Sequence, residues 1–248
     1  MLQFPPDDLL ACSRFFLLTD EISAPADFIL HRLLAQKYKA SKGSKVIVLS
    51  TSSDLDRWKT LASKSNINLG QLATNGSFIF VDLLNEAVLP ISEPFGNAIT
   101  RSLRPLYDMV ETELSVADVD NRPLVILDDV SSLAWLGFST LELSRFTRAV
   151  WAICRKSNAS LVCRYHILDP AEPESLFQKL LQLASYHIEV RPLASGRSGA
   201  VSGEVCMHLG PSEPSPDLHL ISRQAAVQYR LTDIGSVFFE KGTSVGVL

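Results

Sequence analysis

Short apolar runs alternate along the chain with longer amphipathic stretches of helical period. The runs at 45–50 (KVIVLS), 77–82 (SFIFVD) and 124–128 (LVILD) have the length and continuity of strands buried on both faces of a sheet. The stretch at 26–40 between the first such runs gathers its leucines on one helical face. This alternation predicts an α/β fold with a mostly parallel central sheet and helices on both faces.

The remaining elements of this region follow the same two periods. Two further strands are predicted at 14–19 and 161–167. Further helices are predicted at 54–64, 139–156 and 176–184. One more helix is indicated by apolar residues three or four apart: Ile99, Leu103, Leu106, Val110 and Leu114.

Beyond residue 186 the helical stretches stop and only strand patterns remain. Strands are predicted at 187–193, 204–209, 227–232 and 236–240, which would extend the sheet by antiparallel strands or a C-terminal hairpin. The intervening loops are rich in Gly, Ser and Pro and lie between late strands rather than between domains. We therefore expect residues 1–248 to form a single domain.

Composition limits what such a domain can do alone. The 248 residues are 46% hydrophobic and 20% charged, enough for a continuous core. The formal net charge is −4 and the isoelectric point is near 5.7, which argues against an independent nucleic-acid-binding domain. A subunit that contributes one basic patch to a larger surface remains compatible with this balance.

Cysteine spacing and terminal composition suggest an intracellular soluble protein. Cys12, Cys154, Cys163 and Cys206 are far apart and form no metal-ligand spacing, so we expect free thiols in a reducing compartment and no bound metal. The first residues show neither a basic segment nor a long apolar run, and no stretch reaches the length of a membrane span. We expect no leader peptide and no membrane association.

A phosphate loop is missing from the place where an α/β nucleotide-binding domain carries it. That loop needs glycines whose N–H groups face the phosphates, and a lysine. Residues 19–27 (TDEISAPAD) contain neither, and Pro25 removes one N–H donor. Asp20, Glu21 and Asp27 would repel a triphosphate. The sequence therefore predicts no nucleotide site, no cofactor and no catalytic residues.

The run at 124–128 nevertheless ends in two acids, Asp128 and Asp129, a pattern that presents a carboxylate to magnesium in NTPases. Two interpretations remain open. The acids could bind loop N–H groups at the carboxyl edge of the sheet, or they could build a separate metal-dependent active site. Scattered histidines support no catalytic motif, and His187, on an alternating strand, is expected to be structural.

Basic residues gather on one arc of the helix predicted at 139–156. They are Arg145, Arg148, Arg155 and Lys156, and they lie opposite its apolar face. The arc could be an ordinary solvated surface. It could instead contact an acidic partner or an RNA backbone.

Two segments together resemble one known family. Residues 125–137 (VILDDVSSLAWLG) resemble the acid-ended strand of Elongator complex subunit six, and residues 227–231 (VQYRL) with 236–242 (SVFFEKG) resemble its terminal hairpin. The final Val247 and Leu248 agree with the same hairpin. The order of elements matches over nearly the whole chain, and the family also lacks a phosphate loop.

The resemblance implies a RecA-like fold without catalysis. Elongator subunits four, five and six form a hetero-hexameric ring that binds tRNA and supports modification of its wobble uridine by the catalytic subcomplex, in the cytoplasm and also in the nucleus. Loops after the central strands of RecA-like rings face the pore, which makes Arg164 and His166 candidates for tRNA contacts; the basic arc is a separate candidate for such contacts. A different RecA-like pseudo-ATPase scaffold is the alternative within this fold.

The C-terminal hairpin is a candidate subunit interface. Val237, Phe238 and Phe239 are consecutive, so in a strand they point to both faces. One face can pack on the sheet, and the other would then need a partner, with Lys241 beside it. The alternative is that the late strands bury both faces within this chain.

Overall fold

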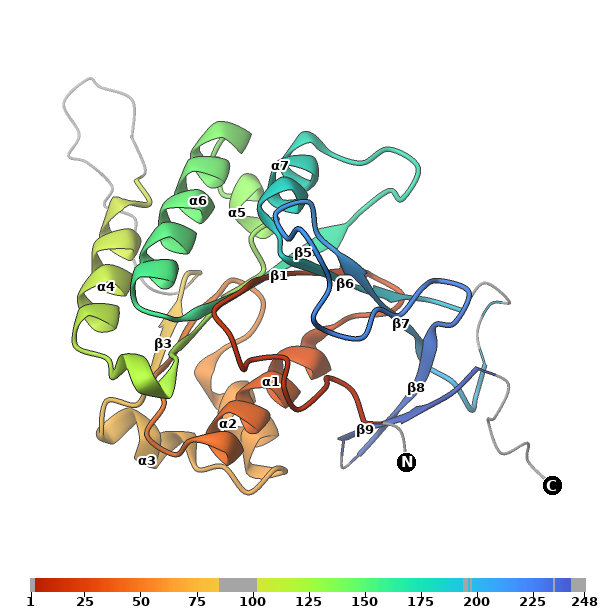
Figure 1. The fold of residues 1–248 in the computed structure, drawn as a ribbon, viewed down its shortest axis with the longest axis horizontal. Coiled ribbons are helices and arrows are strands. Elements are labelled where there is room, and N and C mark those ends of the chain that lie inside the picture. The colour runs from red at the N-terminus through yellow and green to blue at the C-terminus, as the bar shows by residue number, and fades with distance from the viewer. Residues whose placement is uncertain (1–2, 85–101, 194–195, 197, 234, 242–248) are drawn as a thin grey trace.

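One continuous sheet of nine strands, in the order β3-β2-β4-β5-β1-β6-β7-β8-β9, forms the centre of the fold. The computed structural model describes residues 3–84, 102–193, 196, 198–233 and 235–241. Neighbouring strands from β3 to β6 pair in parallel, and those from β6 to β9 pair antiparallel. The predicted α/β, RecA-like architecture with antiparallel C-terminal strands is confirmed (Figure 1).

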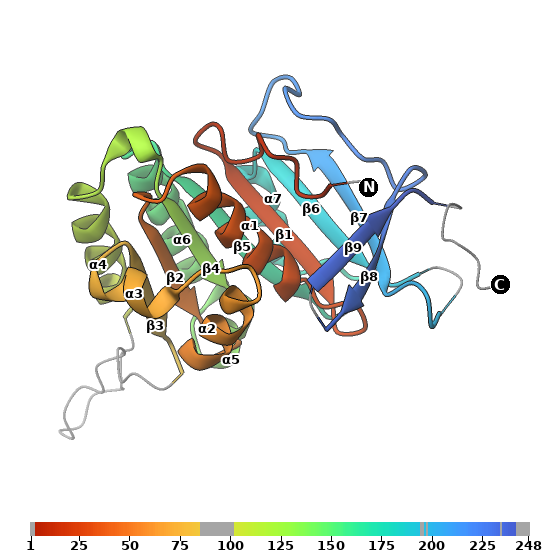
Figure 2. The same cartoon turned by 90° about the horizontal axis from the view of Figure 1, so that it is seen from below.

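The six strands of the parallel part are β1 (Phe15–Glu21), β2 (Val46–Ser50), β3 (Phe78–Asp82), β4 (Leu124–Asp128), β5 (Ser160–Ile167) and β6 (Tyr186–Arg191). The antiparallel part continues with β7 (Gly203–Leu209), β8 (Val227–Thr232) and β9 (Gly235–Phe239). Figure 2 shows the strands side by side beneath one helical layer, with β8 and β9 at the far end of the sheet.

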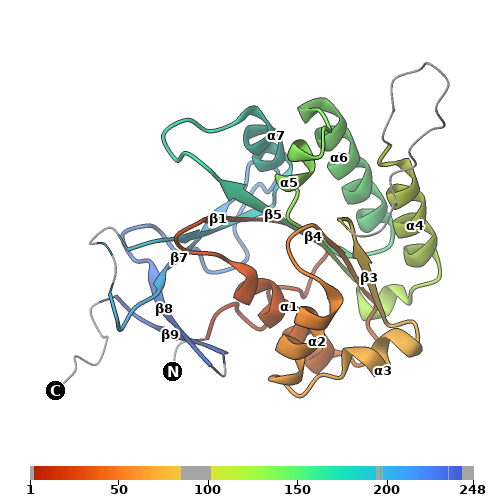
Figure 3. The same cartoon turned by 180° about the vertical axis from the view of Figure 1, so that it is seen from behind.

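Helices cover both faces of the parallel part (Figures 1 and 3). One face carries α1 (Asp27–Ala40), α2 (Leu55–Ser63) and α3 (Leu69–Thr74). The other face carries α4 (Arg104–Ser115), α5 (Ser132–Trp135), α6 (Thr140–Lys156) and α7 (Ser175–Leu183), and a 3₁₀ turn, η1 (Val119–Asn121), precedes β4. Helix α6 begins with a capping box between Ser139 and Glu142.

The alternation of side chains along β1 divides the core into two halves. Phe16 and Leu18 join the cluster that packs against α1, whereas Phe15 and Leu17 join the cluster beneath α6 and α7. All four side chains are fully buried. The unbroken apolar run therefore follows from helices that cover both faces.

Most predicted boundaries agree with the structure within two residues. Helices α3 and α5 were not predicted, because six and four residues are too short to establish a helical period. Strand β1 continues past Thr19 to Glu21, which brings Asp20 into the sheet. Ile99, Val247 and Leu248 lie outside the described residues.

All four cysteines carry free thiols. Cys154, Cys163 and Cys206 are buried, and burial raises the pKa of each thiol, whereas Cys12 is exposed. Within the described part of the chain, no helix combines the length and apolarity needed to span a membrane.

Candidate functional site

The turn between β1 and α1 is closed by a carboxylate of the chain itself. Glu21 and Ala24 form a tight turn, and α1 begins at Asp27 after Pro25. Asp20 is the second-to-last residue of β1. Its side chain accepts a 2.6 Å hydrogen bond from the backbone N–H of Ala26, the residue that precedes α1. Because a helix N-terminus attracts anions, Asp20 occupies the position where a phosphate would otherwise bind.

Arg164, on the neighbouring strand β5, holds this carboxylate in place. Its Nε and Nη2 donate to Asp20 Oδ2 at 3.0 and 2.8 Å, and its Nη1 donates to Asp128 Oδ1 at 3.0 Å. The three side chains are at most 4% exposed. Burial alone would lower the pKa of Arg164, but the two carboxylates raise it above its ordinary value, so the guanidinium stays charged.

Asp128 ends β4, on the other side of β5, and is held by hydroxyl groups as well as by Arg164. Ser52 Oγ donates to its Oδ2 at 2.7 Å, and Ser50 Oγ donates at 3.2 Å. Burial raises the pKa of Asp128, while Arg164 and Ser52 act in the opposite direction. The prediction that Asp128 binds loop N–H groups is wrong, because its partners are two hydroxyls and a guanidinium.

Asp129 binds a loop N–H group, as the structural interpretation of the two acids expects. Its Oδ1 accepts the backbone N–H of Ser131 at 3.0 Å and also the hydroxyl of that residue. Its Oδ2 accepts the hydroxyl of Ser132 at 2.6 Å. Asp129 thus fixes the start of α5 with both of its oxygens.

His166, two residues beyond Arg164, completes the cluster. Its Nδ1 lies 2.5 Å from Asp20 Oδ1, and its Nε2 lies 3.8 Å from Asp129 Oδ2, while 26% of its side chain remains exposed. The contact with Asp20 raises the pKa of His166 more than burial lowers it. The site as a whole is a buried network of two acids and an arginine, with a histidine at its surface.

The chemistry open to this network is limited by its own hydrogen bonds. The carboxylate of Asp20 already binds the N-terminus of α1, and Arg164 already binds Asp20 and Asp128. Both side-chain oxygens of Asp128 accept hydrogen bonds. An incoming phosphate would have to displace Asp20 against its charged partner, and magnesium would compete with Arg164 for Asp128. The polar groups at this edge of the sheet are therefore bonded to one another within the chain.

Some of the residues predicted to contact tRNA are exposed in the structure, and one is buried. Arg145, Arg148, Arg155 and Lys156 are all exposed on α6, opposite its buried face. None of the four forms an ion pair with another described residue. Arg164 is buried within the fold, so its guanidinium is not presented to a partner in this structure.

The hairpin residues also separate into two groups. Phe238 is 2% exposed and packs within this chain, with ring centroids 5.7 Å from Phe4 and 6.2 Å from Phe28. It is a core residue here, which corrects its assignment to an interface. Val237 and Phe239, on the other face, are half-buried, and Lys241 pairs with Glu204 at 3.3 Å.

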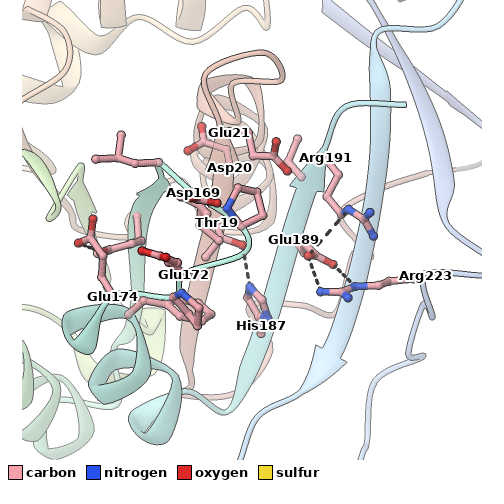
Figure 4. Close-up of a pocket in the computed structure, with 17 residues that line it drawn as sticks. Thr19, Asp20, Glu21, Asp169, Glu172, Glu174, His187, Glu189, Arg191 and Arg223 are labelled. Atoms are coloured by element: carbon pink, nitrogen blue, oxygen red, sulfur yellow. Dashed lines mark hydrogen bonds and ion pairs between the residues drawn. The ribbon is translucent and has the colours of Figure 1, made fainter. Parts of the chain in front are cut away.

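A cavity of about 310 Å³ opens on the other side of Asp20, between the carboxyl ends of β5 and β6 (Figure 4). His187 lines it and contacts Thr19 Oγ1 at 2.7 Å. Burial lowers the pKa of His187 to about 4, so this histidine is neutral, in keeping with a structural role. The cavity was not predicted, because its walls come from four separate parts of the chain.

The antiparallel ribbon of β6 and β7 brings together metal-ligand types that are far apart in sequence. Ligand atoms of Glu189, Cys206 and His208 lie within 4.8 Å of one another. However, Arg223 donates to both oxygens of Glu189, at 2.8 and 2.9 Å, and His208 contacts one of them. Burial would raise the pKa of Glu189, but His208 and Arg223 lower it to about 2. The carboxylate is therefore already neutralised by protein cations.

Comparison with known proteins decides the family. The family model described as Elongation complex protein 6 matches residues 1–233. The chain belongs to this family. The resemblance to this family is thereby confirmed, and the turn closed by Asp20 is a feature of an Elongation complex protein 6 family member.

Similar proteins of this family come from several vertebrates. Proteins named Elongator complex protein 6 are 24% identical in Danio rerio, covering 94% of this chain and 92% of the relative, and 24% identical in Xenopus laevis, covering 97% and 95%. One from Rattus norvegicus is 24% identical, covering 89% and 88%. The similarity thus extends over nearly the full length of each protein.

Proposed function

We propose that this chain is a non-catalytic subunit of the Elongator complex, assembled with subunits four and five in a hetero-hexameric accessory ring. In that ring it supports tRNA binding and wobble-uridine modification by the catalytic subcomplex, in the cytoplasm and in the nucleus. The observation that carries the proposal is the turn after β1, where Asp20 and Arg164 fill the phosphate position of a family member with the fold of an NTPase.

The alternatives are less well supported by the same contacts. A metal-dependent enzyme would need Asp128 or Asp129 to face a ligand, yet their oxygens accept hydrogen bonds from Arg164 and from four serines. An unrelated RecA-like pseudo-ATPase is disfavoured because the family match spans residues 1–233. A subunit that supplies surfaces is consistent with both facts.

The basic arc of α6 is the best-supported RNA contact of this chain. Its four cations are exposed and unpaired among the described residues, so they can neutralise phosphates without first breaking an internal ion pair. His166, partly exposed at the carboxyl edge and with a raised pKa, is a second candidate. Arg164 contributes indirectly by holding Asp20, which in turn contacts His166.

Coexpression with subunits four and five tests the assembly directly. Native mass measurement should detect one complex that contains two copies of each chain. Recovery of this chain only as a free monomer would contradict the proposal.

The RNA role is tested on the assembled ring with Arg145→Gln, Arg148→Gln and Arg155→Gln combined. We expect a lower affinity for tRNA and a salt dependence reduced by roughly two to three phosphate contacts. Unchanged affinity and salt dependence would remove α6 from the RNA surface.

A further inference from the structure

The cavity between β5 and β6 has a marked excess of negative charge. Its lining includes six carboxylate residues and two arginines, and His187 is held neutral. The carboxylates are Asp20, Glu21, Asp169, Glu172, Glu174 and Glu189. We call this cavity, with its lining residues, the acidic pocket.

Some carboxylates of the acidic pocket have a cationic partner, and others have none among the described residues. Arg223 and Arg191 face Glu189 (Figure 4). Asp20 is held by Arg164, outside the lining of the pocket. Arg191 also acts on Glu21: burial raises the pKa of Glu21, and Arg191 lowers it. In the loop after β5, Glu174 accepts the hydroxyl of Tyr165, whereas Glu172 forms no side-chain ion pair or hydrogen bond with another described residue. Asp169 accepts only the backbone N–H of Ala171, at 2.8 Å. Asp169 and Glu172 therefore have no cationic partner among the described residues.

Apolar side chains stand beside these free carboxylates. Leu168, next to Asp169, lines the pocket and is 52% exposed. Phe177 and Val190 also line the pocket. Exposed apolar surface beside two carboxylates without a cation suits a cationic side chain with an aliphatic stem.

The topology of the sheet supports a binding role at this place. Strand β1 leads to α1 on one face, and its neighbour β5 leads to α7 on the other, so the loops diverge and leave a crevice between them. Ligands of open α/β sheets bind in such crevices, at the carboxyl ends of the strands. The volume of about 310 Å³ is at the small end of the range for ligand pockets and suits a side chain rather than a nucleotide.

We propose that the acidic pocket is a docking site for an arginine or lysine side chain carried on an apolar segment of a protein partner. The proposal rests on the proposed function in one respect, since we expect the partner to be another subunit of the same assembly. Phosphate-bearing RNA does not fit, because the carboxylates without a cation carry their own negative charge. The pocket and the basic arc of α6 would thus serve different partners.

The first test uses the isolated chain and needs no partner subunit. The probe is the peptide acetyl-Leu-Arg-Leu-amide, with the uncharged citrulline analogue as its control, followed by NMR. We expect the arginine peptide to bind with a dissociation constant on the order of 1 mM at low salt, and the citrulline peptide about tenfold more weakly. Equal binding of the two peptides would overturn the proposal.

A charge-neutral variant identifies the surface. Glu21→Gln, Asp169→Asn and Glu172→Gln combined should abolish the preference for arginine, while keeping the fold, because these side chains are half-buried or exposed. The matched control combines Asp8→Asn, Asp56→Asn and Glu111→Gln, three exposed acids elsewhere, and should bind as the unaltered chain does. An arginine preference that survives the first set of substitutions would overturn the proposal.

The second test uses coexpression with subunits four and five. We expect the pocket variant to enter the complex at least tenfold less than the control variant, and a photo-crosslinker at Pro170 to capture a protein segment with arginine or lysine. Normal incorporation of the pocket variant, or a crosslink to tRNA alone, would overturn the docking site but leave the proposed function intact. If even the unaltered chain fails to assemble, the proposed function is lost, and the peptide titration alone decides the docking site.

Discussion

Replacing Arg164 by methionine should destabilise the protein severely, because it leaves two buried carboxylates without their cation. The substitution keeps most of the aliphatic volume and removes three hydrogen bonds, two to Asp20 and one to Asp128. The carboxylates are 0% and 1% exposed and cannot turn to water. Breaking a buried ion pair in this way costs about 3–5 kcal/mol, a large part of the stability of an ordinary domain.

The loss should depend on pH with a defined sign. Burial already raises the pKa of Asp128 above 3.8, and Arg164 is the main group that opposes this. Without Arg164 this pKa rises further, so the folded variant takes up a proton more readily than its unfolded chain. Stability of the variant therefore falls as pH rises through that pKa, and its deficit is larger near about pH 7 than near about pH 5.

Urea unfolding followed by circular dichroism measures both effects. Arg145→Met, on the exposed face of α6, is the matched control and should change the free energy of unfolding by less than about 0.5 kcal/mol. Adding Asp20→Asn and Asp128→Asn to Arg164→Met should recover at least half of the loss, because the two carboxylates that lost their cation are then uncharged. A loss below about 1 kcal/mol, or one that is equal at both pH values, would refute the reasoning.

The remaining predictions use separate assays. Calorimetry should detect no ATP binding by the isolated chain, and micromolar binding abolished by Asp128→Ala would contradict the closed turn after β1. Phe238→Ala should cost about 3–5 kcal/mol in urea unfolding, whereas Phe239→Ser should fold normally and reduce entry into the ring; equal stability of the two would disprove this division. His166→Gln should lower stability below about pH 6.5, with the difference fading as pH rises through the raised pKa of His166; a difference that grows with pH would reverse the assignment.

The fold was predictable because the pattern of apolar and polar residues alone locates its strands. The run at 124–128 matches β4 in both boundaries, since an unbroken apolar run between polar turns leaves little freedom in placing a buried strand. Helix α3 was missed because its start depends on one side-chain cap, Asn68 to the N–H of Gln71, rather than on an apolar face. Short capped helices carry too few residues for periodicity to detect.

The site was predictable only in part, because its partners meet through strand order. The sequence indicates that residues 19–27 cannot cradle a phosphate, and it marks Asp128, but it gives no sign that Arg164 faces inward between them. That relation depends on β5 lying between β4 and β1, and the register that pairs Leu18 with Arg164 exists only in the folded sheet. The acidic loop at 168–174 was visible, yet the cavity behind it needed β6 as its second wall.

Strand β1 is first in the chain but lies between β5 and β6 in the sheet, which has a consequence for biosynthesis. During translation, Phe15 to Leu18 leave the ribosome long before the two strands that cover their edges, so the nascent chain holds an uncovered hydrophobic strand until residue 191 emerges. Such long-range pairing slows folding and exposes intermediates to aggregation. The protein should therefore depend on chaperones while it is being made, and a chain truncated before β6 should be degraded rather than accumulate as a stable fragment.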